Sequence, residues 1–499
     1  MEKDVPTIGR QAFFPFIRQK RLQPPAFYGK EREMYFDKND FSLETLTLGE
    51  CTIRFRSWRK LVYVKRPVEP EYQRMNLFIP EDYFEGKNVN GYSPDSAPVF
   101  MPNTVGGYLP GKAGEPGPAS SGQDAPNSIF RALAHGYVVA SPALRGRTLT
   151  APDSSFSGKA PACIVDYKAA VRFLRFFTKD LPGDKNKIIT NGTSAGGALS
   201  ALMGASGNHP DYEPWLQELG AADTADDIFA ASCYCPITDL EHADMAYEWQ
   251  FLNVNDYHRS QMVMQEGGRP VFSPVDGFMN AVEVRASRAE ASLFPSYVNS
   301  LRLKAPDGQT LTLQPDGSGP FAEYVKQVVL RSAQRAIDEG KDLSAKNWLH
   351  LESGRAVSMD FAGYVRDITR MKTAPAFSAL TMDSAENSLF GNSSEDFRHF
   401  TAYSHENSLT GGSRAEAKIV RLMNPTSYIR DPKAATARHW RIRHGERDRD
   451  TSLAVSSILT LLLQEQGASV DYHAPWDTPH AGDYDLDELF AWIDWLCLG

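Results

Sequence analysis

Apolar and polar residues along the chain form two recurring patterns, short apolar runs and longer stretches with helical spacing. The apolar runs predict buried strands at residues 97–101, 136–143, 187–191, 228–235, 439–443 and 468–473. Helical spacing follows several of these runs, as in the apolar series Ile164, Tyr167, Val171 and Leu174. Alternating strands and helices imply a mainly parallel sheet with helices on both faces.

The alternation resumes near the C-terminus after a long interruption. An apolar stripe from Val455 to Leu462 ends before Gly467, which is typical of a helix C-terminus. Residues Leu486 to Cys497 predict a closing helix. The stretch 54–65 is basic and interleaved with apolar residues, which favours a strand with one wet face over a binding patch.

Between the two alternating parts the pattern changes to long, charged helical stretches such as 321–341, and buried strands are scarce. The chain has 499 residues, whereas single hydrophobic cores stop growing at about 250–300 residues. We therefore expect an α/β core built from residues 1–235 and 425–499. A mostly helical lid domain, residues 236–424, is inserted between these two parts.

Charge and hydropathy narrow the classes of partner. The net charge is −9 and the pI is near 5.7, which argues against nucleic acid or an anionic membrane as the main partner. No apolar run approaches the roughly 20 residues that a membrane span needs. The first residues lack the apolar core of a signal peptide. We expect a cytoplasmic protein, or a secreted one if a leader has been trimmed, and leave its oligomeric state open.

Five cysteines are present, and their spacing fits no common zinc motif. Cys233 and Cys235 fall in register on one face of a predicted strand. We interpret the cysteines as buried free thiols in a reducing compartment, and we expect neither a metal nor another cofactor.

The chemistry of the chain centres on Gly192-Thr193-Ser194-Ala195-Gly196, a G-x-S-x-G motif. By itself this motif is weak, but here it follows a predicted strand and opens a small-residue helix. That setting is the one a nucleophile elbow requires, with small residues on both sides of the serine. We predict that Ser194 is the nucleophile of an α/β-hydrolase.

A serine hydroxyl needs a base, and the base needs an anchoring acid. In this fold the acid and then the histidine follow the serine along the chain. His480 lies in the loop after the last predicted strand, and Asp448 follows the strand before it in an H-G-x-x-D sequence. We predict His480 as base and Asp448 as acid, with Asp450 as the rival acid.

Ester cleavage also needs two fixed N–H donors for the oxyanion. The N–H of Ala195, which follows the nucleophile, is one predicted donor. The second donor comes from the loop after the third strand in this fold, where Gly106-Gly107 follows the run 97–101. We favour Gly107, although the glycine pair alone would also serve a simple turn.

At this point the sequence resembles a known family, the bacterial tannases (tannin acylhydrolases) of the α/β-hydrolase fold. The resemblance covers most of the chain and is weakest near the N-terminus. Its marks are long and unusual, and they are Pro102–Tyr108, Arg145–Arg147, Thr190–Gly197, Glu241–Phe251, Arg370–Lys372, Arg441–Ser452 and Pro475–Leu486.

The resemblance implies a cofactor-free serine esterase that releases gallic acid from galloyl esters, so that its partners are small galloyl esters and gallate. It implies the same triad, Ser194, Asp448 and His480, and places galloyl-binding side chains at Lys372, Glu386 and Asp450. Carboxylates accept hydrogen bonds from phenolic hydroxyls, and an ammonium donates to phenolic oxygen. Without the resemblance, each of these three charges is typical of a solvated surface.

Two other functions stay open at this stage. A feruloyl or general carboxylesterase would use the same triad with a different acyl group. A non-catalytic binding protein on a hydrolase scaffold is disfavoured, because such proteins usually lose a triad member and all three are present here. Turnover of methyl gallate against methyl ferulate would separate the esterases.

Overall fold

A nine-stranded sheet forms the centre of the protein in the computed structural model, which describes residues 34–119, 125–264 and 270–499. The N-terminal stretch that bears on a leader peptide lies outside these residues. The strand order is β1-β2-β3-β5-β4-β6-β7-β12-β13. The strands span β1 Ser42–Leu48, β2 Cys51–Val62, β3 Arg74–Pro80, β4 Pro98–Pro102, β5 Val138–Pro142, β6 Asp184–Thr193, β7 Ala230–Tyr234, β12 His439–Arg443 and β13 Ser469–His473.

The sheet is parallel from β5 to β13 and antiparallel at its N-terminal edge, where β2 covers most of the predicted strand 54–65. Pairs from β5 through β4, β6, β7 and β12 to β13 are all parallel. Strands β1, β2, β3 and β5 pair antiparallel. Strands β4, β5 and β7 are buried at every position, β12 at all but its first, and β6 over Ile188–Gly192, as expected of strands covered on both faces. The predicted α/β-hydrolase architecture is confirmed.

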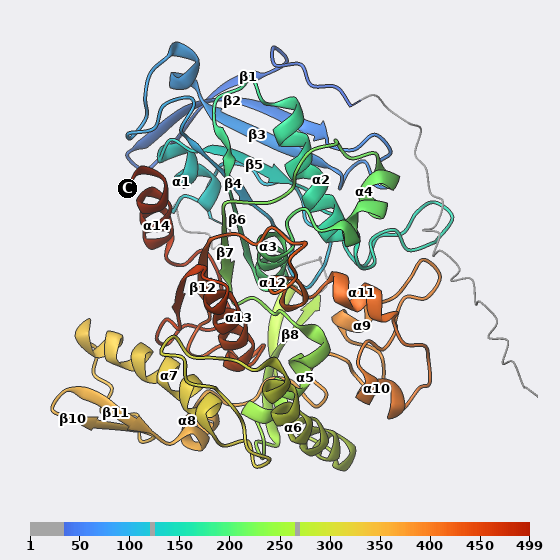
Figure 1. Cartoon of the computed structure of the whole chain (residues 1–499), viewed down its shortest axis with the longest axis vertical. Helices are drawn as coiled ribbons and strands as arrows, with labels where there is room; N and C mark the ends of the chain where they lie inside the picture. The colour runs from blue at the N-terminus through green and yellow to red at the C-terminus, as the bar shows by residue number, and fades with distance from the viewer. Residues whose placement is uncertain (1–33, 120–124, 265–269) are drawn as a thin grey trace, which may run out of the picture.

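Helices cover both faces of this sheet. Helices α1 and α14 pack together on one face, and α2 and α3 pack together on the other (Figure 1). The core helices and 3-10 turns are η1 Glu81–Glu85, α1 Ser128–Ala134, α2 Ala162–Phe177, α3 Ala195–Ala205, η2 Pro210–Tyr212, α4 Glu213–Leu219, α13 Leu453–Glu465 and α14 Leu486–Leu498. Gly467 follows α13 with φ 79°, in agreement with the predicted helix end.

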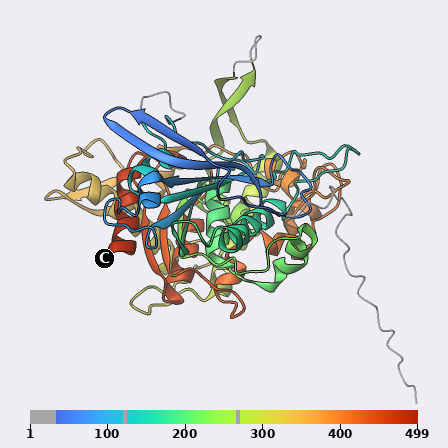
Figure 2. The same ribbon diagram turned by 90° about the horizontal axis from the view of Figure 1, so that it is seen from above.

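The chain between β7 and β12 supplies most of the elements in the lower half of Figure 1, and it packs against the core helix α13. Its helices are α5 Leu240–Gln250, α6 Ala281–Leu301, α7 Pro320–Asp338, α8 Phe361–Ile368, α9 Ala385–Leu389, α10 Ala402–Glu406, α11 Ala417–Leu422 and α12 Thr426–Ile429. Two hairpins also occur, β8 Asp256–Met264 with β9 Pro270–Phe278 and β10 Leu349–Glu352 with β11 Arg355–Met359. Figure 2 shows the first hairpin projecting from the molecule.

Within the described residues all five cysteines are free, but their burial differs from the expectation. Cys163, Cys233 and Cys235 are buried, whereas Cys51 is exposed on the edge hairpin and Cys497 is partly exposed. Cys235 also lies just past the end of β7, with φ 36°, and not inside the strand. None of the helices in the described part of the chain combines the length and apolar character that a membrane span needs.

Candidate active site

Ser194 lies in the sharp turn that joins β6 to α3. Its backbone has φ 58° and ψ −121°, a conformation that residues with a side chain rarely adopt and that stores strain. The neighbouring strand holds the turn, because the Ser194 N–H donates to the Tyr234 carbonyl at 3.0 Å. The turn therefore places Ser194 at the carboxyl edge of the parallel sheet.

Two glycines allow the chain to turn this tightly. A Cβ on Gly196 would lie 2.6 Å from Asn103 Oδ1, and a Cβ on Gly197 would lie 2.5 Å from the Tyr234 carbonyl oxygen. Both separations are too short for real atoms, so these positions require glycine. Atoms of neighbouring segments that pack against the turn therefore leave no room for a side chain at Gly196 or Gly197.

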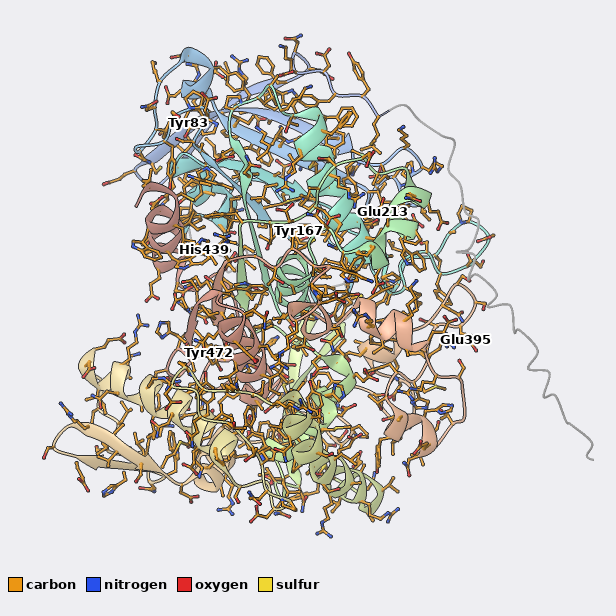
Figure 3. The ribbon with its side chains drawn as sticks, in the orientation of Figure 1. Tyr83, Tyr167, Glu213, Glu395, His439 and Tyr472 are labelled. Atoms are coloured by element: carbon orange, nitrogen blue, oxygen red, sulfur yellow. The ribbon has the colours of Figure 1, made fainter. Side chains whose placement is uncertain are left out.

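The side chain of Asn103 ties the loop after β4 to this turn, a role that sequence reasoning missed. Its Nδ2 donates to the carbonyls of Asn191 and Gly196 at 3.1 and 3.0 Å. Its Oδ1 accepts from the Val105 N–H at 3.2 Å. The hydroxyl of Tyr167, labelled in Figure 3, anchors the end of β4 by donating to the Met101 carbonyl.

The two predicted oxyanion donors lie on the segments that Asn103 joins. Gly107 has φ 52°, and its carbonyl accepts from Arg147 Nε at 2.9 Å. Ala195 is the first residue of α3, where backbone N–H groups lack helical partners. Among the hydrogen bonds of the described residues, neither the Gly107 nor the Ala195 N–H has an acceptor. Neither N–H group is thus committed to another acceptor within the part of the chain that the structure describes.

The partly exposed His480 and the buried Asp448 form a pair on the loops after β13 and β12. His480 Nδ1 lies 2.8 Å from Asp448 Oδ2, and Asp448 is 1% exposed. Asp448 Oδ1 accepts from the Asp450 N–H at 2.8 Å. Asp450 Oδ2 is 3.9 Å from the same His480 nitrogen, so Asp448 is the closer of the two acids.

The pKa values of Asp448 and His480 are both shifted in the direction that favours the charged form of each residue. Burial alone raises the pKa of Asp448, but the charge of His480 and the hydrogen bonds to Asp448 outweigh it, and the pKa lies below its ordinary value. Burial alone lowers the pKa of His480, but Asp448 outweighs it and raises that pKa above 6.5. An imidazolium is therefore well stabilised at this position.

Ser194 Oγ has no hydrogen-bond partner among the described residues, and His480 Nε2 faces the thiol of Cys235 at 3.8 Å. Catalytic hydrogen bonds are often long without substrate and tighten only in the complex. Within the described residues, Cys235, Asp448 and His480 are also the one group of three potential metal ligands whose ligand atoms lie within 4.8 Å of one another. Sequence reasoning gave the thiol no role, because nothing local links residue 235 to residue 480.

The three predicted ring-binding residues come together beside this pair. Lys372 Nζ lies 3.4 Å from Asp450 Oδ1, and both side chains are partly exposed. Burial raises the pKa of Glu386, opposed by the nearby charges of Lys372 and Arg147. Arg147 is thus part of this charged group, although the sequence indicated no function for it.

Helix α5 positions both segments that carry these charges. The Tyr247 hydroxyl accepts from the N–H groups of Met371 and Lys372 at 3.2 and 3.0 Å. It donates to the Arg449 carbonyl at 3.0 Å. The buried Arg370 guanidinium donates to the Lys372 carbonyl at 2.6 Å and pairs with Glu248. The backbone at Lys372 and the loop of Asp448 and Asp450 are therefore fixed to one helix.

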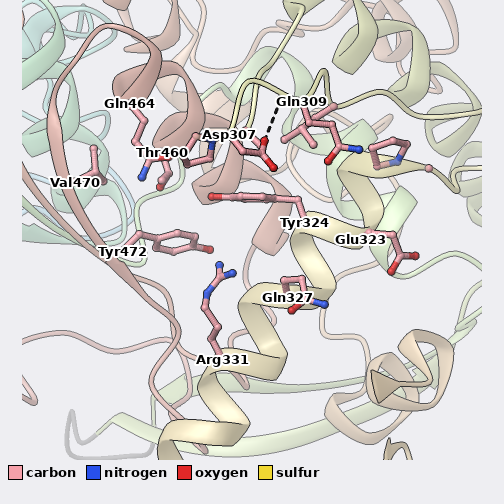
Figure 4. Close-up of a pocket in the computed structure, with 15 residues that line it drawn as sticks. Asp307, Gln309, Glu323, Tyr324, Gln327, Arg331, Thr460, Gln464, Val470 and Tyr472 are labelled. Carbon is pink, nitrogen blue, oxygen red and sulfur yellow. Dashed lines mark hydrogen bonds between the residues drawn. The ribbon is translucent and has the colours of Figure 1, made fainter. Parts of the chain in front are cut away.

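A cavity of about 870 Å³ lies elsewhere, between α7, α13 and β13 (Figure 4). Its walls include Tyr324, Arg331, Gln464 and Tyr472. Among the described residues, those that line it include none of the side chains predicted for the triad or for ring binding. The cavity is separate from the site formed around Ser194.

The chain is similar in sequence and in structure to several known esterases. The family model BD-FAE matches residues 117–266. A tannase structure from Lactobacillus plantarum is 45% identical, with a TM-score of 0.89 over 93% of this chain and 100% of that chain. The structure of Fusobacterium nucleatum tannase is 44% identical, with a TM-score of 0.89 over 94% and 100%.

Two further similarities add detail. A structure described as tannin acyl hydrolase in complex with ethyl gallate is 44% identical, with a TM-score of 0.87 over 93% of this chain and 99% of that chain. Esterase LipQ of Mycobacterium tuberculosis is 34% identical over 116 residues, which is 23% of this chain. The match spans only 26% of the length of LipQ.

Proposed function

Since the chain belongs to the bacterial tannase family and is a carboxylic ester hydrolase, we propose that it hydrolyses galloyl esters to gallate through Ser194, His480 and Asp448. The observation that carries the proposal is the position of Asp450. This carboxylate lies 3.9 Å from the His480 ring and 3.4 Å from Lys372. The residues that would bind the aromatic ring thus lie directly beside the residues that would cleave the ester.

In the proposed reaction Ser194 Oγ attacks the acyl carbon and His480 Nε2 takes its proton. The oxyanion forms between the N–H groups of Ala195 and Gly107, and each donor lowers the activation barrier by roughly 3 kcal/mol. Asp448 holds the imidazole through Nδ1 and stabilises its charge. His480 returns the proton to the departing alcohol, which leaves a galloyl ester on Ser194. Water, activated by the same histidine, then releases gallate.

The charged group beside the triad suits a ring with three adjacent hydroxyls. Asp450 accepts hydrogen bonds from phenolic O–H groups, and Lys372 donates to phenolic oxygen. Glu386, whose pKa burial raises, takes part in the same recognition. A site built for hydroxyls rejects analogues that lack them by about 10⁴ or more, because its own polar groups are then left unpaired.

Two esters that differ only in their ring hydroxyls test this proposal. We expect the wild type to hydrolyse methyl gallate and to lose most of its activity on methyl benzoate. Asp450→Ala or Glu386→Ala should lower kcat/KM for methyl gallate by about 10–100-fold, at roughly 1.5–3 kcal/mol per charged contact. Both variants should affect methyl benzoate much less, whereas Ser194→Ala should abolish both activities.

The control is Asp383→Asn, an exposed acid three residues before Glu386, which should change neither activity. Equal wild-type activity on methyl gallate and methyl benzoate would leave only a general esterase. Turnover of methyl ferulate above methyl gallate would favour the feruloyl alternative.

A further inference from the structure

The thiol of Cys235 lies against the proposed base, although ester hydrolysis by Ser194, His480 and Asp448 gives it no part. Its Sγ is 3.8 Å from His480 Nε2 and donates to the Ala481 carbonyl at 3.3 Å. The residue is 1% exposed. Its position is well fixed, since its own N–H donates to the Arg443 carbonyl.

The distance between Cys235 Sγ and His480 Nε2 is close to the distance between two ligand atoms bound to one metal ion. Zinc binds thiolate sulfur at about 2.3 Å and imidazole nitrogen at about 2.0–2.1 Å with tetrahedral angles. Those values place the sulfur and nitrogen of one tetrahedral site about 3.5–3.6 Å apart. The observed 3.8 Å between Cys235 Sγ and His480 Nε2 needs a shift of only a few tenths of an ångström to match.

Asp448 completes the arrangement on the far side of the imidazole. Histidines that bind metals usually donate their other ring nitrogen to a carboxylate, which fixes the ring and raises its basicity. His480 Nδ1 meets Asp448 in this way at 2.8 Å. One ligand atom each from Cys235, Asp448 and His480 lie within 4.8 Å of one another. Cys235 and His480 thus form a preformed ligand pair, with Asp448 holding the imidazole ring in place.

We propose that Cys235 and His480 form an inhibitory site for a borderline or soft divalent cation, with Zn²⁺ the expected occupant. On binding, the Cys235 thiol releases its proton to solvent, and sulfur and Nε2 each donate an electron pair to the ion. Water fills the remaining positions. The ion enters from the substrate side, where the His480 side chain is 20% exposed.

The consequence for activity rests on the proposed function. Nε2 is the atom that must accept the Ser194 proton, and a nitrogen that binds a cation cannot accept one. Zinc should therefore block hydrolysis of every ester alike, galloyl or not. Mg²⁺ and Ca²⁺ prefer oxygen ligands, so neither should inhibit.

The test compares Cys235→Ala with Cys233→Ala. Cys233 is also buried, but it lies two residues earlier inside β7 and its thiol contacts Ser200, which makes it a matched control. Both changes are made in a Cys51→Ala background, because Cys51 is exposed. Each variant's rate is measured against its own zinc-free rate, so that a change in basal activity does not affect the comparison.

We expect a zinc concentration that lowers the Cys51→Ala rate tenfold to do the same to the Cys233→Ala variant. The Cys235→Ala variant should need at least ~10-fold more zinc, the smallest loss expected when a metal site is disturbed. Zinc inhibition of undiminished strength in Cys235→Ala, or none in the parent, would overturn the proposal.

Direct binding separates this proposal from the proposed function. Cd²⁺ should produce a thiolate-to-metal absorption band equivalent to one ion per chain, which Cys235→Ala abolishes and Cys233→Ala keeps. Asp448→Asn should weaken Cd²⁺ binding by about 10–100-fold. No band from Cys235 would overturn the site itself. A band at Cys235 with unchanged hydrolysis would overturn its inhibitory role and contradict His480 as the base.

Discussion

We predict that Tyr247→Phe weakens galloyl recognition more than ester chemistry, because one buried hydroxyl holds two segments of the site together. The Tyr247 hydroxyl binds the Met371 and Lys372 N–H groups and the Arg449 carbonyl, at 3.2, 3.0 and 3.0 Å. These hydrogen bonds fix the backbone of the lysine that would meet the ring hydroxyls. They also fix the loop that carries both acids.

The magnitude follows from the three hydrogen bonds that the Tyr247 hydroxyl makes. A buried hydrogen bond contributes about 0.5–1.5 kcal/mol net, so removing all three should lower the free energy of unfolding by about 2–4 kcal/mol. Phenylalanine keeps the ring and its packing against Phe251, at 4.6 Å between centroids. The change therefore removes the polar interactions and leaves no cavity.

The assay measures denaturant unfolding together with kcat/KM for methyl gallate and methyl benzoate. We expect kcat/KM to fall by about 10-fold or more for the gallate ester, equivalent to one misplaced polar contact, and much less for the benzoate ester. Tyr212→Phe is the control, because it also removes a buried tyrosine hydroxyl, which donates to the Leu422 carbonyl. It should lower stability without changing the ratio of the two rates. Equal loss on both esters in Tyr247→Phe would refute the reasoning.

Three further predictions concern the insertion, the turn and the base. Burial raises the pKa of Glu290 from 4.5 to about 9, so the folded state keeps a proton that the unfolded state loses, and the free energy of unfolding should fall as pH rises between these values. Glu290→Gln should flatten this fall in denaturant titrations, and an unchanged slope would contradict the assignment. Gly196→Ala should lower kcat by about 100-fold or more, because the new Cβ would lie 2.6 Å from Asn103 Oδ1. The control is Gly117→Ala, whose Cβ would meet no atom within 4 Å. It should leave kcat unchanged. The raised pKa of His480 places the acidic limb of the kcat/KM profile above pH 6.5. This limb should move to lower pH in Asp448→Asn. An acidic limb at or below pH 6.5 in the wild type would refute the prediction.

Much of the fold could be predicted because its strands are buried on both faces. The run His439–Arg443 was predicted with the bounds that β12 has, and β4, β5, β6, β7 and β13 lie within a few residues of the predicted runs. The antiparallel edge was less visible. Strand β3, Arg74–Pro80, is buried at six of its seven positions and lies between two strands of opposite direction, which no local pattern indicates.

In the site, too, features set by nearby residues could be predicted, whereas contacts between distant segments could not. The turn at Ser194 follows from neighbouring glycines, and the spacing of His480 and Asp448 follows from the order of strands. The contact of Cys235 with His480 joins residues 245 positions apart, and the approach of Arg147 to Glu386 joins the core to the insertion. Such contacts depend on packing between distant segments, so composition and spacing could not predict them.

The most direct test of the proposed galloyl esterase site is a crystal structure of the Ser194→Ala variant with bound gallate. We expect the ring hydroxyls to contact Lys372, Glu386 and Asp450. We also expect the gallate carboxyl group to lie within hydrogen-bond reach of the Ala195 and Gly107 N–H groups. Gallate bound with its hydroxyls away from the three charged residues, or bound only in the cavity between α7 and β13, would contradict the proposed site.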